Sequence, residues 1–275
     1  MKICVFGANG YLGTSVYLQL NRSGEDEVVG TYLQEPAMLD NLYQLDVNEP
    51  EAFSDFYKQE NPDVVVWAVM SGPNEYQLAD QGLMHLITHL TPQTKLVYIS
   101  SDLVFSDGHG PYSEEDSIST LPDDHAYHNY VNGKVKAEYL IDNELTNAVI
   151  LRAGPIYGEN GIGKLDERTD RMAYHLRAGK SVAYRDDLIR TFVHIDDLTN
   201  VIDGMVHHDV TGVYHVGSTE NLSFYQFMKG QAKQMGYQDR LIEKDSEVEK
   251  VDQELPKDTS LATNKINDVM HITFQ

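Results

Sequence analysis

Short runs of β-branched and apolar residues alternate with longer amphipathic stretches through the first half of the chain. The apolar runs are 2–8, 27–33, 61–69 and 95–101. The amphipathic stretches between them are 14–21, 50–60 and 80–90. This rhythm predicts right-handed βαβ units and a parallel sheet. Residues 64–69 and 96–100 are almost continuously apolar, as expected where helices cover both faces of a sheet. The pattern therefore predicts an α/β fold with a doubly wound parallel sheet.

The second half of the chain keeps this pattern with interruptions. Residues 148–154 form a further apolar run, and strand-and-helix patterns return at 190–202 and 212–218. Residues 155–185 are rich in glycine and charge, and a polar stretch near 238–260 is typical of a loop-rich lobe over a sheet edge. We expect a main domain formed by 1–154 with about 186–216. A small interleaved C-terminal lobe would be formed by about 155–185 with 217–275.

A glycine-rich turn follows the first predicted strand and leads into a helical stretch. Its glycines allow a tight turn and let the backbone approach a pyrophosphate, whose charge is favoured by the amides at a helix start. The spacing is GxxGxxG, not the GxGxxG of the commonest dinucleotide fingerprint, and such glycines also occur in plain turns. Because a strand precedes and a helix follows, we interpret the turn as a dinucleotide site formed by Gly7, Asn9, Gly10, Tyr11, Leu12 and Gly13.

The choice between NAD and NADP depends on the end of the second predicted strand. An acid that binds the ribose 2′-hydroxyl of NAD is expected about 20 residues after the glycines. The sequence there reads GTYLQ, with Glu35 slightly beyond, and no Arg adjoins it unless Arg22 folds toward it. On this ground we favour NADP, with NAD as the alternative. Asp46 and Val47 could bracket the adenine, although Asp46 could equally cap the following helix.

Tyr130 and Lys134 are four residues apart and would lie on one face of a helix. Reduction of a ketone leaves an alkoxide that needs a proton. A phenol, with a pKa of about 10, donates that proton more readily if a neighbouring cation lowers its pKa. Lys134 could supply this charge and also bind the nicotinamide ribose. The pair could also belong to an ordinary amphipathic helix surface. With 17 Tyr in the chain, a Tyr can stand four residues before a Lys by chance.

Hydroxyl groups stand at the carboxyl end of the 95–101 run, where open α/β sheets bind ligands. The Ser101 hydroxyl would donate a hydrogen bond to the substrate oxygen that Tyr130 protonates. The sequence Ser100-Ser101-Asp102 could also simply cap and turn the chain. The predicted catalytic group is therefore Ser101, Tyr130 and Lys134.

Composition and charge exclude several classes of partner. The 275 residues are 41% hydrophobic, enough for a sizeable core. The formal charge of -22 argues against general binding of nucleic acid or of a membrane surface, while a local basic site for one phosphorylated ligand stays open. The single cysteine, Cys4, lies in an apolar run, where we expect it to be buried. Without a signal-peptide pattern or a long apolar span, we expect a cytoplasmic protein.

Taken together and in order, these motifs resemble the extended short-chain dehydrogenase/reductase superfamily. Within it they are most similar to the dTDP-4-dehydrorhamnose reductases and related sugar-nucleotide reductases. Besides the glycine loop, Asp46 and the Tyr130–Lys134 pair, the matching segments are SSDLVF at 100–105, YSEED at 112–116, LRAGPIYG at 151–158, RTFVHIDD at 190–197 and GVYHVG at 212–217. The resemblance implies a Rossmann-type domain that binds NAD(P), with Ala68 also at the cofactor, and a small lobe that binds the substrate.

Two segments depart from the pattern of these reductases. The predicted catalytic helix reads YVNGK at 130–134, where they favour YGxSK. The fourth apolar run ends in Trp67, Ala68, Val69 and Met70, where they commonly carry Asn-Ala-Ala-Ala. We expect the bulky Trp67 and Met70 to narrow or reshape the nicotinamide region, which weakens the rhamnose assignment more than the cofactor assignment.

The leading hypothesis is NADPH-dependent reduction of a keto group on a nucleotide-activated sugar. Tyr130 would give the proton, Lys134 would tune it and Ser101 would hold the carbonyl. Two alternatives stay open. One is an epimerase or dehydratase that recycles a bound cofactor, which Asp102 beside the serine favours. The other is a non-catalytic NADP-binding regulatory subunit, as some proteins resembling these reductases have become.

Polar residues outside the catalytic group complete the expected site. We expect Asp102, Arg190 and His194 to contact the substrate, although Arg190 could pair instead with a neighbouring Asp at 186 or 187. His85 and His89 are four apart on a predicted helix, but no third ligand accompanies them, so we predict no metal site. The expected partner is a small nucleotide-sugar, with a homodimer as a possible assembly.

Overall fold

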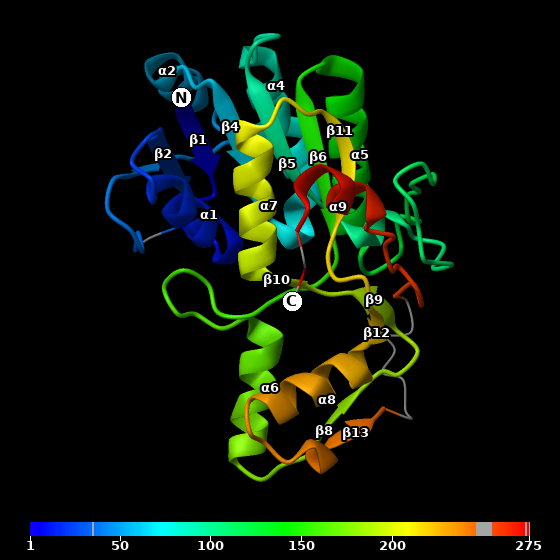
Figure 1. The fold of residues 1–275 in the computed structure, drawn as a ribbon. Coiled ribbons are helices and arrows are strands. Elements are labelled where there is room, and N and C mark those ends of the chain that lie inside the picture. The colour runs from blue at the N-terminus through cyan, green and yellow to red at the C-terminus, as the bar shows by residue number, and fades with distance from the viewer. Residues whose placement is uncertain (35, 246–254, 273, 275) are drawn as a thin grey trace.

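The computed structural model describes residues 1–34, 36–245, 255–272 and 274. Its larger part is an α/β domain around a central sheet, and a smaller lobe lies beyond the carboxyl ends of the strands of that sheet (Figure 1). Within these described ranges, no helix is both long enough and apolar enough to cross a membrane.

Seven parallel strands form the central sheet in the order β11-β6-β5-β4-β1-β2-β3. The chain adds β2 and β3 on one side of β1 and the other strands on its other side. The order therefore reverses between β1 and β4, the position at which such sheets bind ligands. This confirms the predicted doubly wound sheet. Its strands are β1 (Lys2–Phe6), β2 (Glu27–Tyr32), β3 (Leu42–Gln44), β4 (Val64–Trp67), β5 (Lys95–Ser101), β6 (Ala148–Ala153) and β11 (Gly212–Val216).

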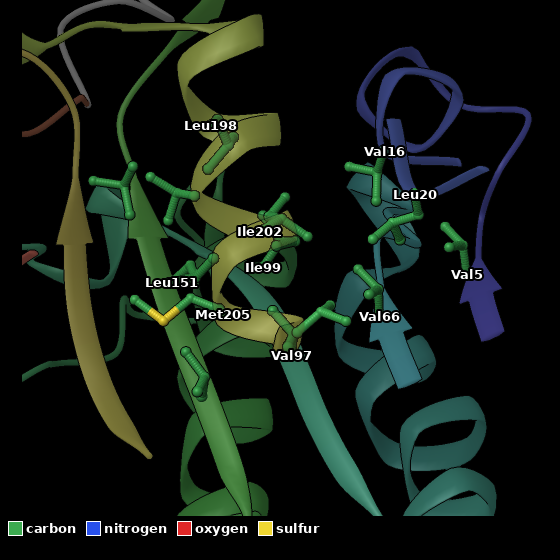
Figure 2. Close-up of a cluster of buried hydrophobic side chains, with 14 of the residues drawn as sticks. Val5, Val16, Leu20, Val66, Val97, Ile99, Leu151, Leu198, Ile202 and Met205 are labelled. Atoms are coloured by element: carbon green, nitrogen blue, oxygen red, sulfur yellow. The ribbon is translucent and has the colours of Figure 1, made fainter. Parts of the chain in front are cut away.

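Helices cover both faces of the sheet because alternate strand residues point to opposite sides. Ile3 and Val5 of β1 belong to one core, part of which Figure 2 shows, whereas Cys4 and Phe6 belong to another. The first core lies under α1 (Tyr11–Asn21), α7 (Ile195–His207) and α9 (Asn264–Met270). The second lies under α2 (Pro50–Glu60), α3 (Glu75–Leu78), the π-helical turn η2 (Ala79–Leu83), α4 (Met84–His89) and α5 (His128–Glu144).

The expectation that Trp67 narrows the nicotinamide region is wrong. Its side chain is 1% exposed and lies in the second core, with its ring centroid 5.4 Å from that of Phe6. Strand alternation turns Trp67 into this core, whereas the next residue, Ala68, contacts the glycine loop. Met70 is 67% exposed and packs in neither core.

The small lobe has a hydrophobic core of its own, which includes Met172, Leu176 and Phe227. It is built by α6 (Glu167–Arg177), α8 (Phe224–Gln234) and the parallel pair β8 (Val182–Tyr184) and β13 (Ile242–Lys244), with the short turn η4 (Asp239–Leu241). Two further strand pairs join the lobe to the main domain (Figure 1). They are β7 (Ile156–Tyr157) with β10 (Val193–His194), and β9 (Ile189–Thr191) with β12 (Asn221–Ser223).

The C-terminal residues leave the lobe and return to the main domain. Residues 256–262 run between the 108–112 loop and β9, with backbone hydrogen bonds to both. Helix α9 then packs beside β11, and its Ile266 is fully buried in the first core. Residues 264–270 therefore lie on the sheet and not in the lobe, where the sequence analysis put them. An apolar pattern of only seven residues gave no sign of this return.

Candidate active site

The glycine loop joins β1 to α1 and leaves no room for a side chain at Gly7 or Gly13. Gly7 has φ +83°, and a Cβ atom there would come within 2.9 Å of the Ala68 carbonyl oxygen. A Cβ atom on Gly13 would come within 2.0 Å of the Gly7 carbonyl oxygen. Helix α1 starts at Tyr11 after Gly10, without a side-chain cap or an acid in its first turn. The loop thus fits a pyrophosphate, because its bare backbone and the positive helix end can approach an anion closely.

The other loop residues hold the turn in place. The Asn9 side chain donates to the carbonyls of Gln34 and Pro36, at 3.4 and 3.1 Å, and accepts from the Met38 amide at 2.6 Å. It therefore fastens the glycine loop to the segment after β2. The Tyr11 hydroxyl donates to the Gly158 carbonyl at 2.6 Å and so links α1 to the start of the lobe. Leu12 packs against the first core.

The residues expected near the adenosine half of the cofactor have mostly local contacts. The Asp46 carboxylate accepts from the backbone and side-chain nitrogens of Asn48, at 2.9 and 3.1 Å, so it shapes the turn before α2. Val47 is buried, and its carbonyl lies 3.0 Å from Nδ1 of His85. Arg22 caps the far end of α1, about 16 Å along the helix from the glycine loop. Glu35 lies outside the described residues.

The three predicted catalytic residues come together beyond the carboxyl end of β5. Tyr130 and Lys134 lie on α5, and the Lys134 ammonium donates to the Ile99 carbonyl of β5 at 3.0 Å. The Ser101 hydroxyl lies close enough to Tyr130 to influence the ionisation of its phenol. It also accepts from the Leu103 amide at 3.2 Å and so caps the turn η3 (Asp102–Val104). Ser101 therefore caps a chain turn, one of the two roles that the sequence allowed, and also lies close to Tyr130, as the other role requires.

Burial raises the pKa of Tyr130 above its ordinary value. The Lys134 charge and the nearby Ser101 hydroxyl act in the opposite direction, while Glu75 and Asp102 add to the rise. Burial also disfavours the ammonium of Lys134, but Tyr98, Glu75 and Tyr130 outweigh it and raise the pKa of Lys134, so the lysine is charged at neutral pH. Lys134 thus lowers the pKa of Tyr130, as expected, without bringing it below the ordinary value of a phenol.

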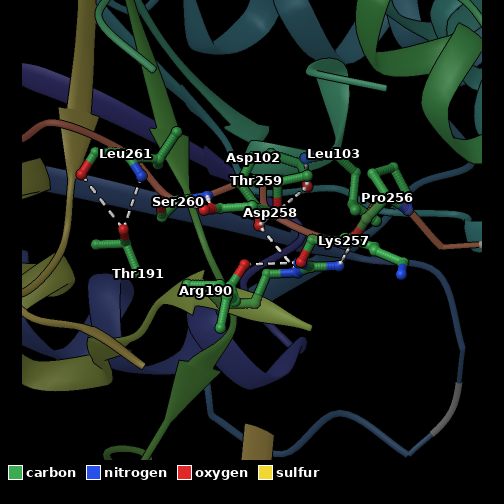
Figure 3. A network of polar contacts seen from close by, with 12 residues as sticks. Asp102, Leu103, Arg190, Thr191, Pro256, Lys257, Asp258, Thr259, Ser260 and Leu261 are labelled. Carbon is green, nitrogen blue, oxygen red and sulfur yellow. Dashed lines mark hydrogen bonds and ion pairs between the residues drawn. The ribbon is translucent and has the colours of Figure 1, made fainter. Parts of the chain in front are cut away.

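Asp102 and Arg190 form a buried unit with the C-terminal segment (Figure 3). The Asp102 carboxylate accepts from the hydroxyls of Ser101 at 3.2 Å and Thr259 at 2.5 Å, and lies 3.6 Å from Nε of Arg190. The Arg190 guanidinium donates to the carbonyls of Pro256 and Lys257 at 2.8 and 3.1 Å. It is 2% exposed. These contacts fix the C-terminal segment and leave the guanidinium inside the protein.

His194 and the histidines of α4 have structural contacts. His194 caps α7 by accepting from the Asp196 amide at 3.3 Å, and its ring packs on Tyr157. Nδ1 of His89 lies 2.7 Å from the His85 carbonyl, and its Nε2 lies 3.2 Å from the Ser54 hydroxyl. The sequence suggested that Arg190 pairs with Asp186 or Asp187. Asp187 pairs instead with Arg185, whose Nε is 2.6 Å from its carboxylate.

A buried network behind the catalytic group was missed by the sequence analysis. Arg152 of β6 pairs with Glu138 of α5 at 2.8 Å, and the Ser100 hydroxyl donates to the same carboxylate at 2.5 Å. Glu114 accepts from the His215 amide at 3.0 Å, while its carbonyl lies 3.4 Å from Arg152. Glu114, Arg152 and His215 each stand in one of the motifs noted above. Their position in these motifs was the only signal, because their partners lie on distant elements of the chain: β6, α5, β11 and the loop that carries Glu114.

Comparisons with known proteins agree with this geometry. A family model described as NAD dependent epimerase/dehydratase family matches residues 3–217. The chain is similar to the probable low-salt glycan biosynthesis reductase Agl14 of Haloferax volcanii, 24% identical over 257 residues that cover 88% of this chain and 83% of that protein. It is equally similar to methionine adenosyltransferase 2 subunit beta of Bos taurus, 24% identical over 249 residues that cover 82% and 69% of the two chains.

Solved structures share the whole fold. A hypothetical dTDP-4-dehydrorhamnose reductase from Sulfolobus tokodaii superposes with a TM-score of 0.82 at 21% identity, over 100% of this chain and 96% of that one. The dTDP-4-dehydrorhamnose reductase of Bacillus anthracis, in complex with NADP, gives 0.79 at 19% identity over 99% and 94%. The dTDP-glucose 4,6-dehydratase of the same organism, in complex with NAD, gives 0.81 at 16% identity over 100% and 92%.

The family match spans the glycine loop, Ser101 and the Tyr130–Lys134 pair. It confirms the resemblance to the extended short-chain dehydrogenases/reductases and the predicted enzyme class, an NAD(P)-dependent oxidoreductase. The chain therefore belongs to the NAD-dependent epimerase/dehydratase family of extended short-chain dehydrogenases/reductases.

Proposed function

We propose that this protein reduces a keto group on a nucleotide-activated sugar, using a nicotinamide dinucleotide. One observation carries the proposal: Ser101, Tyr130 and Lys134 converge at the sheet edge to which the glycine loop of β1 also belongs. Parallel strands have their carboxyl ends together, so β1, β4 and β5 bring the two groups of residues to the same end of the sheet.

Each residue of the site has a definite task in this proposal. A bound nicotinamide would supply the hydride, and the glycine loop at 7–13 would hold its pyrophosphate. The Ser101 hydroxyl would orient the substrate carbonyl by a hydrogen bond to its oxygen. Tyr130 would donate its phenolic proton to the same oxygen as negative charge develops there. The phenol is protonated at neutral pH, as a proton donor must be, and the Lys134 charge works against the rise in its pKa that burial causes.

The contacts of Asp102 favour reduction over dehydration. An acid that takes part in elimination must present a carboxyl oxygen to the substrate. The Oδ2 atom of Asp102 accepts from Thr259 and lies 3.6 Å from Nε of Arg190, and the residue is 4% exposed, so little of the carboxylate is open to a substrate. The next residue, Leu103, carries no carboxyl group that could replace it. We therefore assign Asp102 a structural role next to the site. The residue that favoured the dehydratase alternative is then not available for elimination.

The surroundings of β2 favour NAD over NADP, against the preference drawn from the sequence. A 2′-phosphate needs a cationic partner, yet no Lys or Arg stands between Arg22 and Lys58. Arg22 lies at the far end of α1. The Asn9 amide, which points toward the segment after β2, is bonded to two backbone carbonyls. We therefore propose NADH as the reductant, and expect NADH to bind more tightly than NADPH in a fluorescence titration.

The charge of the small lobe fits an anionic substrate. Residues 155–192 and 217–245 carry eleven of the 21 Lys and Arg of the chain but only ten of its 43 Asp and Glu. This lobe is therefore close to neutral in a protein of charge -22. A nucleotide diphosphate would meet less repulsion at these residues than over the rest of the chain, which is strongly acidic, so electrostatics would favour its approach at the lobe.

The test is turnover with a panel of keto sugar nucleotides that differ in base and sugar. Oxidation of NADH with stoichiometric formation of the hydroxyl product supports the proposal. Conversion of the sugar without net oxidation of NADH contradicts it and supports the epimerase or dehydratase alternative. Tight binding of NADH without turnover of any substrate supports a non-catalytic regulatory subunit; one relative, methionine adenosyltransferase 2 subunit beta, is named as a subunit.

A further inference from the structure

Glu75 is a buried acid at the start of α3 that the proposed mechanism does not use. It is 2% exposed, and its Oε1 lies 2.8 Å from the Lys134 ammonium. Its other carboxylate oxygen accepts from the Ser71 amide at 2.7 Å, which fixes the orientation of the side chain. A carboxylate excluded from water needs such partners, because burial of an unpaired charge is strongly unfavourable.

Gly133 allows this contact to form. A Cβ atom at Gly133 would come within 2.5 Å of the carbonyl carbon of Glu75 and within 2.6 Å of the Tyr76 amide nitrogen. Any larger residue would push α3 away from α5 and carry the Glu75 carboxylate with it. Gly133 stands inside the YVNGK segment, one of the two departures from the reductase pattern. The close approach of α3 gives this departure a physical reason.

The protein holds the ammonium of Lys134. An ammonium has three donors. Lys134 donates to the Ile99 carbonyl at 3.0 Å and to Glu75 at 2.8 Å, and its nitrogen lies over the Tyr98 ring, 5.0 Å from the ring centroid. Its side chain is 4% exposed. The ammonium therefore has a fixed position, and its charge is balanced by an adjacent carboxylate.

We propose that Glu75 is a positioning residue of the active site, which holds the Lys134 ammonium in place and partly cancels its charge at the Tyr130 hydroxyl. This inference rests on the proposed function for its role in catalysis, but the electrostatic effect on Tyr130 exists with or without turnover. Its consequence is that Tyr130 stays protonated to higher pH than it would beside an unpaired lysine.

The charges around Tyr130 give the sign of this effect. Lys134 on the same helix favours the phenolate, whereas Glu75 on α3 and Asp102 on η3 disfavour it. Tyr98 on β5 faces Lys134 and is itself held neutral by burial. Removal of the Glu75 charge leaves Lys134 uncompensated, so the phenolate of Tyr130 becomes easier to form. The titration of Tyr130 should therefore move to lower pH.

The experiment follows the ionisation of Tyr130 by NMR in protein labelled with carbon-13 at the phenolic carbon of tyrosine. The Tyr130→Phe variant identifies the resonance among the 17 tyrosines. We expect the Tyr130 midpoint to fall in Glu75→Gln. Asp80→Asn is the matched control, because Asp80 and Lys136 form a surface pair between η2 and α5. We expect no change in that variant.

Two further variants keep the test decisive. Glu75→Asp retains the charge and should return the midpoint toward that of the wild type. Gly133→Ala changes no charge but displaces α3, and should lower the midpoint even if Glu75→Gln does not fold. An unchanged Tyr130 midpoint in folded Glu75→Gln, or in folded Gly133→Ala where Glu75→Gln does not fold, overturns the inference. Because the titration needs no substrate, a lack of turnover counts against the proposed function alone.

Discussion

Replacement of Arg190 by Met tests whether this arginine is structural or binds the substrate. The guanidinium is 2% exposed, donates to backbone carbonyls of Pro256, Lys257 and Ile189, and lies beside the Asp102 carboxylate. Met has a similar unbranched stem, so the change removes the charge and the donors while most of the packing remains. If Arg190 is structural, the folded protein should lose stability even without any ligand.

The expected loss can be worked from these contacts. Removal of one partner of a buried ion pair costs about 3–5 kcal/mol, because the other charge is left buried and unpaired. Burial already raises the pKa of Asp102, so part of the loss should be relieved by protonation of this carboxyl. The expected loss is a large share of the roughly 5–15 kcal/mol by which a protein domain is normally stable. The double variant Arg190→Met with Asp102→Asn should recover part of it.

Urea unfolding at neutral pH, followed by circular dichroism, measures the loss directly. The wild type, the two single variants and the double variant form a cycle that isolates the interaction between Arg190 and Asp102. A free energy of unfolding within about 0.5 kcal/mol of the wild type in Arg190→Met, together with weaker binding of a sugar nucleotide, would refute the structural assignment. Arg190 would then belong to the substrate site, as the sequence suggested.

Two further predictions concern the network behind the site and the glycine loop. Burial beside Arg152 lowers the pKa of His215 from 6.5 to about 3. Between these two values the unfolded chain therefore binds a proton at His215 that the folded protein does not bind. The free energy of unfolding should fall by about 2 kcal/mol for this reason between neutral pH and about pH 5, and this contribution should be absent in His215→Gln. Gly13→Ala should abolish dinucleotide binding in a fluorescence titration, since its Cβ would meet the Gly7 carbonyl oxygen at 2.0 Å. Its control, Gly230→Ala, has open space around the new Cβ and should bind normally with unchanged or higher stability.

The sequence predicted the sheet and the glycine loop because both depend on local patterns. Continuous apolar runs identify strands covered on both faces, and the loop is recognisable from its glycines between a strand and a helix. The pairing of Tyr130 with Lys134 likewise follows from helix periodicity. The position of Ser101 could be predicted because a strand end is a local feature, and the parallel topology brings the carboxyl ends of neighbouring strands together.

Features that depend on distant contacts could not be read in this way. Glu75 and Gly133 carry no pattern of their own, and their contact exists only because α3 packs on α5. Trp67 lies in a run that is apolar on both faces, so no alternation showed which way its side chain turns. The partners of Arg190 come from the C-terminal segment, whereas its sequence neighbours offered two nearby acids that the structure assigns elsewhere.

The central claim is that Tyr130 donates the proton in reduction of a sugar-nucleotide ketone. Its most direct test compares the wild type and Tyr130→Phe for oxidation of NADH with the substrate found in the panel, alongside the dissociation constant of NADH for each protein. The account predicts that Tyr130→Phe loses turnover by at least about a hundredfold while its affinity for NADH stays close to that of the wild type. Turnover in Tyr130→Phe at the rate of the wild type would contradict the account.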